Sequence, residues 1–149
     1  MVRLILMAIL LGLLTGCGTG GLEPSSQVVQ RALVKFNEVI ALQLSQTQSH
    51  PLSQQLDPSR SSKLPSFEIN QLVITEQKPL VIQDLPAYRV RGTYDLTIQR
   101  QRRRVTQQQN PFDIYLQRQK EGLTWRLALP QSTGIDSFPT WRTYLIKSR

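Results

Sequence analysis

The chain has 149 residues, of which 40% are hydrophobic and 19% charged, and this balance fits one globular domain rather than a disordered chain. Eighteen Lys and Arg residues against ten Asp and Glu residues give a net charge of +8, and the sequence holds one Cys and one His. One Cys excludes an internal disulfide, and one Cys with one His excludes a Cys/His zinc cage, so we expect no metal and no cofactor.

The first residues predict export. A positively charged start, residues 1–3, precedes an apolar run from Leu4 to Leu14. A helix that spans a membrane needs about 20 apolar residues, so this run is too short to span one, but it has the length of a signal-peptide core. We therefore predict a signal peptide over residues 1–16.

The next residues, Leu14-Thr15-Gly16-Cys17, resemble a bacterial lipobox. The resemblance implies that the Cys17 thiol carries a diacylglyceryl group, that a peptidase cuts before Cys17, and that acyl chains such as palmitate hold the protein at a membrane. Two alternatives are an ordinary secretory signal in which Cys17 is incidental and an uncleaved apolar anchor. Residues 17–24 then form a Gly-rich tether that reaches at most roughly 25 Å, at about 3.5 Å per residue.

Residues 25–47 predict one helix. Ser25 or Ser26 can cap its first amides. Apolar residues then recur at helical spacing on one face. They are Val29, Ala32, Leu33, Phe36, Ile40 and Leu44. We expect this face to pack in the core against the strands that follow; the alternative is a face that binds a partner.

A Ser- and Gln-rich segment with three prolines follows over residues 47–66, and we predict a loop there. Its His50 precedes a proline and has no acidic or thiol neighbour in the sequence. We therefore expect His50 to be an exposed loop residue, and we assign no catalytic residue to the chain.

From Phe67 onward, apolar residues alternate with polar ones, as in strands that have one buried and one wet face. The alternation changes parity near Asn70-Gln71, which predicts a bulge. The predicted strands after this point are residues 80–82, 88–98, 112–116 and 123–129. Pro130 ends the last of them, and the aromatic segment 138–146 fits either a final strand or a short helix.

One helix followed by an antiparallel meander predicts an α+β fold in which a curled sheet packs on the helix, and we treat residues 25–149 as a single domain. This order of elements is similar to that of cystatin-like and NTF2-like folds, and it does not specify a function. The glutamine-rich composition and the stretch GTYDL at residues 92–96 resemble small uncharacterised lipoproteins of cyanobacteria. That resemblance implies a domain on the periplasmic or thylakoid-lumen side of a membrane.

Four arginines crowd into five positions between two predicted strands. They are Arg100, Arg102, Arg103 and Arg104. Because like charges repel, we expect them at the exposed tip of a hairpin, where an anion can offset them. The candidate anions are lipid head groups, acidic cell-wall polymers and an acidic patch of a membrane protein. The alternative is a solvated tip that blocks aggregation of strand edges.

A second basic set lies on the predicted wet face of the sheet. Strand parity places Arg89 and Arg91 on one strand of this face and Arg126 on another, a group that can grip a carboxylate or a phosphate. The alternative is a solvated face on which Asp95 and Asp113 neutralise these arginines. Parity favours the alternative, because both acids fall on the same face.

The sequence leaves two hypotheses for function. Nucleic-acid binding, which a basic chain usually suggests, conflicts with the export signal, and no phosphate-binding loop or nucleophile motif indicates an enzyme. The first hypothesis is a membrane-anchored accessory domain whose arginines engage an acidic protein or an anionic lipid. The second is a small-molecule-binding or catalytic domain with a pocket between helix and sheet. A filled core favours the first hypothesis, and a deep cavity favours the second.

Overall fold

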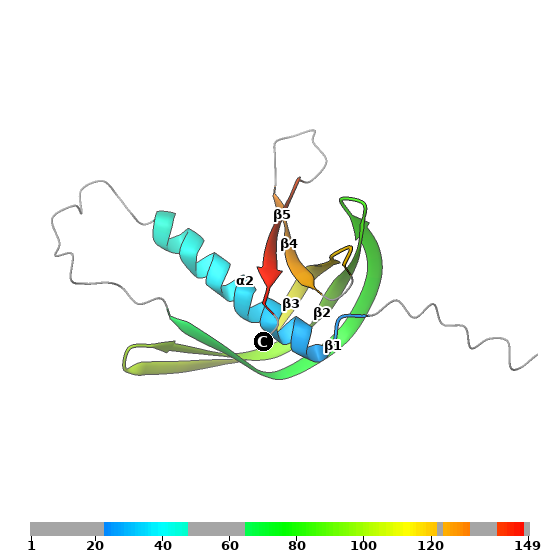
Figure 1. The fold of residues 1–149 in the computed structure, drawn as a ribbon. Coiled ribbons are helices and arrows are strands. Elements are labelled where there is room, and N and C mark those ends of the chain that lie inside the picture. The colour runs from blue at the N-terminus through cyan, green and yellow to red at the C-terminus, as the bar shows by residue number, and fades with distance from the viewer. Residues whose placement is uncertain (1–22, 48–64, 122–123, 132–139, 148–149) are drawn as a thin grey trace, which may run out of the picture.

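The computed structural model describes residues 23–47, 65–121, 124–131 and 140–147 (Figure 1). Over these ranges the elements are α2 (Ser26–Thr47), β1 (Ser66–Ile82), β2 (Leu85–Arg100), β3 (Arg103–Arg118), β4 (Trp125–Gln131) and β5 (Thr140–Ile146). The α+β class is confirmed, since one helix packs against one antiparallel sheet. The predicted signal peptide, Cys17 and His50 lie outside the described residues.

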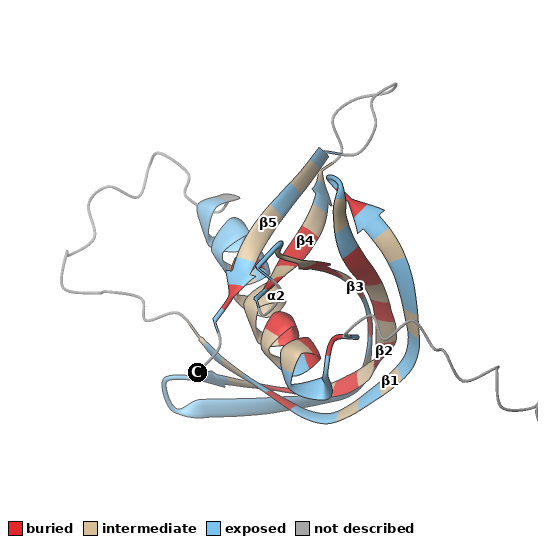
Figure 2. Cartoon of the chain, turned by 45° about the vertical axis from the view of Figure 1, so that its right-hand side comes forward, coloured by how far each residue is buried: buried red, intermediate tan, exposed pale blue. Residues whose placement is uncertain are grey.

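The sheet is a meander whose strand order follows the chain, from β1 to β5, with every neighbouring pair antiparallel. Its first three strands have 17, 16 and 16 residues, far more than the usual ~5–6. Strands of this length twist strongly, and the sheet curls around α2 (Figures 1 and 2). The segment that fits either a strand or a helix in sequence is strand β5, and β4 continues through Pro130 to Gln131.

The helix begins where the sequence predicts. The Val28 amide donates to Ser25 Oγ at 3.4 Å, and the Val29 amide donates to the Ser25 carbonyl at 3.0 Å, so Ser25 caps the first turn. The first half of the predicted apolar face is in the core, since Val29, Ala32 and Leu33 have no exposed surface.

The second half of that apolar face is not buried as predicted. Phe36 is partly buried against the core, but Ile40 is 37% exposed and Leu44 is 62% exposed. The sheet meets α2 mainly through β1, β4 and β5, and the C-terminal end of the helix projects beyond them (Figure 1). Val39, which the predicted face leaves out, is only 5% exposed, so the buried position at this turn is Val39 and not Ile40.

The core between α2 and the sheet is filled by large apolar side chains. Large strand residues in this core are buried, among them Tyr94, Leu96, Ile114, Leu116, Trp125 and Leu127. Tyr88 packs edge to face against Trp125, with ring centroids 6.1 Å apart. The described core extends from the fully buried Pro24 to Ile146, so residues 22–149 contain all of its side chains.

A bulge in β1 brings its backbone against Gly92 of β2. The register between the two strands shifts between Asn70 and Val73, as predicted, and Gln71 has a left-handed φ of 47°. A Cβ on Gly92 would clash with the Val73 carbonyl oxygen and lie 2.9 Å from the Phe112 ring. Only glycine therefore fits at this close approach of two strands.

The outer face of the sheet is not wet throughout, which corrects the prediction from alternation. A second apolar cluster lies there, formed by Ile82, Ala87 and Ala128 with Leu80, Tyr115 and Trp141 packed against them. The Tyr115 and Trp141 rings meet edge to face, with centroids 5.0 Å apart. Ala87 and Ala128 are buried in this cluster, although alanine on an alternating strand gives no sign of burial.

Candidate functional site

The four clustered arginines lie at a hairpin tip, as the sequence predicts. The turn Gln101-Arg102 joins β2 to β3, and Arg100 pairs with Arg103 across it. Gln101 has a left-handed φ of 51°, as residues of tight hairpin turns often do. Residues 99–109 are all exposed. We refer to Arg100, Arg102, Arg103 and Arg104 together as the arginine tip.

One arginine of the tip has an acidic partner. Arg104 Nη2 lies 3.2 Å from Glu68 Oε2 of β1, and both side chains are mostly exposed, so the pair contributes little to stability. Asp95, the nearest acid along the strand, accepts a hydrogen bond from the Gln109 amide at 2.8 Å instead. Among the described residues, the other three arginines of the tip form no ion pair.

A surface hollow of about 860 Å³ opens beside the arginine tip, and we refer to it as the tip hollow. It is lined by Ile98, Arg100, Gln101, Arg102, Arg103 and Val105. Its volume lies within the range of ~300–1,000 Å³ that is common for ligand sites. The lining combines two aliphatic side chains with three guanidinium groups, so it presents both apolar surface and positive charge.

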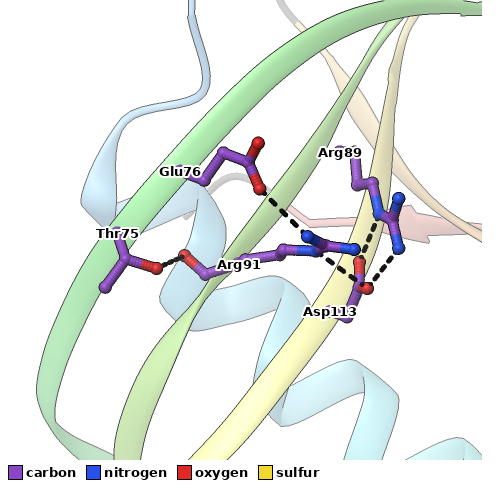
Figure 3. A network of polar contacts seen from close by, with 5 residues as sticks. All are labelled: Thr75, Glu76, Arg89, Arg91 and Asp113. Atoms are coloured by element: carbon purple, nitrogen blue, oxygen red, sulfur yellow. Dashed lines mark hydrogen bonds and ion pairs between the residues drawn. The ribbon is translucent and has the colours of Figure 1, made fainter.

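Arg89 and Arg91 are neutralised by acids of the neighbouring strands (Figure 3). Arg89 donates to both carboxylate oxygens of Asp113, at 2.8 Å from Nε and 2.6 Å from Nη2. Arg91 donates to Asp113 at 3.1 Å and to Glu76 at 3.3 Å, and its carbonyl accepts from Thr75 at 3.2 Å. We refer to these five residues as the Asp113 network.

The charges of the Asp113 network stabilise one another. The hydrogen bond from Arg89, helped by Arg91, holds the pKa of Asp113 below its ordinary value of 3.8, although partial burial opposes this shift. The same hydrogen bond raises the pKa of Arg89. Asp113 therefore neutralises Arg89 and Arg91, as the second interpretation of this face predicts. The expectation that Asp95 also neutralises them is wrong. Arg89 and Arg91 do not form an open anion site.

Arg126 lies apart from the Asp113 network, so the structure does not bring the three arginines together. It is paired with Gln117 of β3, and its Nε is buried without a hydrogen-bond partner in the described part of the chain. It lines a separate hollow of about 330 Å³ with Lys120, Thr124 and the acidic Glu121. Arg126 is a half-buried cation that lines this separate hollow, and it does not extend the surface of Arg89 and Arg91.

Sequence reasoning missed two acids of β1. Glu68 pairs with Arg104, and Glu76 pairs with Arg91. Alternation along β1 marks both as polar-face residues, but the bulges shift the register against β2 after Asn70 and again after Ile74. The partners of these two acids therefore require the register, which the sequence pattern does not supply.

Among the described residues, no helix combines the length and the apolar character that crossing a membrane requires. Within the same ranges, no three His, Cys, Asp or Glu side chains gather into a group that can hold a metal ion.

Comparison of the chain with models of known protein families gives no match. Comparison with curated proteins gives no match, and no solved structure matches the fold. The function is therefore inferred from the geometry and the charge of this chain.

Proposed function

We propose that the chain is an exported lipoprotein, held at a membrane through acylated Cys17, whose folded domain is a non-enzymatic binding module for an acidic partner. The observation that carries the proposal is the arginine tip, four cations at the exposed end of a hairpin, of which one has a described acidic partner. Concentrating like charges at one point is unfavourable unless an anion offsets them. An acidic partner supplies that anion.

The position of the tip supports binding at a distance from the anchor. α2 starts directly after the predicted tether, and its 22 residues span about 33 Å at 1.5 Å per residue. The arginine tip lies on the side of the molecule toward which the C-terminal end of α2 points (Figures 1 and 2). The arginine tip and the start of α2 therefore lie on different sides of the molecule (Figure 1). A membrane complex, an anionic lipid surface or an acidic cell-wall polymer can contact it there.

The size of the expected interaction follows from surface electrostatics. Each basic side chain close to an anionic surface contributes about 1 kcal/mol, and the contribution fades within ~8 Å at physiological salt. Four arginines on one tip therefore suffice for a weak, salt-sensitive contact. The membrane anchor then supplies a high local concentration, which makes a weak contact effective.

The second candidate function is a small-molecule-binding or catalytic domain, with helix and sheet forming a cone as in cystatin-like and NTF2-like proteins. The tip hollow, about 860 Å³ in volume, favours ligand binding as such, but the described residues that line it all belong to the β2–β3 hairpin, so it is not a pocket between helix and sheet. The core argues for the first candidate, because the fully buried side chains of Val29, Leu33 and Leu116 fill the space in which such a cone would hold its ligand.

A photo-crosslinking residue in place of Gln101, in the full chain in its native membrane, tests the proposed function. Gln83 is the matched control, since both are exposed glutamines in hairpin turns with positive φ, 50° for Gln83 and 51° for Gln101. We expect position 101 to crosslink an acidic component that position 83 does not reach. Replacing the tip arginines by Gln should remove that crosslink. Equal crosslinking at the two positions would contradict the proposal.

A further inference from the structure

Aliphatic side chains are uncovered at the same end of the molecule as the arginine tip. On the hairpin, Val105 is 53% exposed and is paired across the strands with the partly buried Ile98. On α2, Ile40 and Leu44 are 37% and 62% exposed. The end of α2 and the hairpin both extend to this side of the molecule, beyond the strands that cover the core (Figure 1).

The tip hollow brings the two aliphatic side chains of the hairpin together with guanidinium groups. Ile98 and Val105 line it, and so does the next cross-strand pair toward the turn, Arg100 and Arg103. Residues directly opposite each other on neighbouring strands have Cβ atoms about 5 Å apart. Arg100 and Arg103 are therefore close enough for their guanidinium groups to bind one phosphate together.

A ligand that matches the tip hollow must be both anionic and apolar. A purely polar anion would bury no apolar area of Ile98 and Val105, so the hydrophobic effect would not contribute to its binding. A purely apolar ligand would dehydrate the guanidinium groups without supplying a partner for them. A phospholipid with an anionic head group meets both requirements, since its phosphate matches the arginines and its acyl chain matches the aliphatic pair.

We propose that the tip hollow binds the phosphate head and one acyl chain of an anionic phospholipid. The inference rests on the proposed function, because it names the acidic partner of the arginine tip. Charge complementarity supports it, since the chain carries a net charge of +8 and the described acid nearest the tip, Glu68, is already paired with Arg104. An acidic protein would match the charge, but it would not require the exposed Val105 beside the arginines.

Single-chain phospholipids, added below the concentration at which they form micelles, test the inference. The chain of residues 22–149 is suitable because it holds all of the described core. Lauroyl lysophosphatidylglycerol carries an acyl chain and an anionic head, lauroyl lysophosphatidylcholine carries the same chain and a net-neutral head, and glycerol 3-phosphate carries the head alone. We expect the first probe to bind about tenfold more tightly than either of the others.

Two variants assign the binding to the tip hollow. Arg103→Gln and Val105→Gln should each weaken the binding of lauroyl lysophosphatidylglycerol by roughly fivefold. The matched controls are Arg142→Gln, at an exposed position of β5, and Val81→Gln, at a valine of β1 that is 69% exposed. The controls should bind as the unmodified chain does, and all four variants should keep its melting temperature.

Several results would overturn the inference. If Arg103→Gln weakens binding and Val105→Gln does not, the tip binds charge alone, and the proposed function survives without the lipid site. Equal binding of the two lauroyl probes would show adsorption without head-group recognition. A lower melting temperature for Val105→Gln would show that this chain itself covers the side chain, and loss of a dimer in that variant would show that a second copy does. Absence of binding to any anionic probe or surface would overturn the proposed function as well.

Discussion

Asp113 of β3 accepts two hydrogen bonds from the Arg89 guanidinium of β2, at 2.8 Å from Nε and 2.6 Å from Nη2. The paired geometry is the strong form of the arginine–carboxylate contact. Arg89 also lies over the Tyr115 ring, with its guanidinium carbon 5.7 Å from the ring centroid. The Asp113 network therefore fixes β2 against β3 on the outer face. In the arginine tip, by contrast, only Arg104 has an ion-pair partner among the described residues.

Asp113→Asn should lower the free energy of unfolding by about 0.5–1 kcal/mol near neutral pH, the size of a partly solvent-screened pair. Because the folded-state pKa of Asp113 lies below its ordinary value of 3.8, the contribution is present above that value and is lost as the pH falls below it. Urea unfolding at pH 7 and at about pH 2 checks this, with Glu121→Gln as the control at an exposed acid. A difference between Asp113→Asn and the unmodified chain that persists at about pH 2 would contradict the ionic account.

Gly92→Ala should destabilise the domain by about 2–3 kcal/mol, because the added methyl group meets the Val73 carbonyl and the Phe112 ring. The same substitution at an ordinary strand position would be favourable for the backbone. Thermal unfolding checks the prediction. An unchanged melting temperature would mean that β1 does not approach β2 at the bulge as closely as the structure has it.

Trp125→Ala and Leu44→Ala compare the stability contributed by the buried core with that contributed by the projecting end of α2. Trp125 is 8% exposed and packs against Tyr88, so its truncation should cost about 3–5 kcal/mol. Leu44 is 62% exposed, so its truncation should change stability by less than about 0.5 kcal/mol. Chemical denaturation of both variants provides the comparison. A large loss from Leu44→Ala would show that the end of α2 is covered in solution.

The helix and the alternating parts of the strands could be predicted from sequence because their signals are local. The strand lengths could not, since residues 80–82 are the end of β1 and β3 begins at Arg103, well before residue 112. Ser25 precedes the helical period, and a change of parity at Asn70 and Gln71 marks the bulge. The extent of contact between elements is not local. Ile40 continues the predicted apolar face of the helix but is 37% exposed, whereas its neighbour Val39, outside that face, is buried. Ala87 is buried in a cluster with side chains of other strands.

The candidate site divides in the same way. The exposed position of the arginine tip could be predicted, because four like charges between two strands repel one another unless they lie at a solvent-exposed hairpin turn. The partners of individual arginines depend on register, and parity alone identified Asp113 for Arg89 while it wrongly added Asp95. Arg126 lies on the same face of the sheet as Arg89, but the two are not adjacent. Arg126 is paired with Gln117, which is paired with Ala87 and not with Arg89.

Cys17→Ser should abolish acylation and release the protein from membranes or leave it uncleaved, because the thiol is the proposed attachment point. The mass of the mature N-terminus from the native host is the measurement. We expect a chain that starts at Cys17 and carries acyl groups. An unmodified Cys17, or cleavage at another bond, would remove the anchor from the account while leaving the fold and the tip unaffected.

The central claim, that the arginine tip binds an acidic surface, is tested most directly by co-sedimentation of residues 22–149 with anionic vesicles at low and high salt. One variant replaces the arginine tip with four Gln residues. A matched control replaces four exposed basic residues elsewhere and so loses the same charge: Lys78, Lys120, Arg142 and Lys147. We predict that the unmodified chain and the control bind at low salt and dissociate at high salt, whereas the tip variant does not bind. Equal binding by the tip variant and the control would contradict the claim.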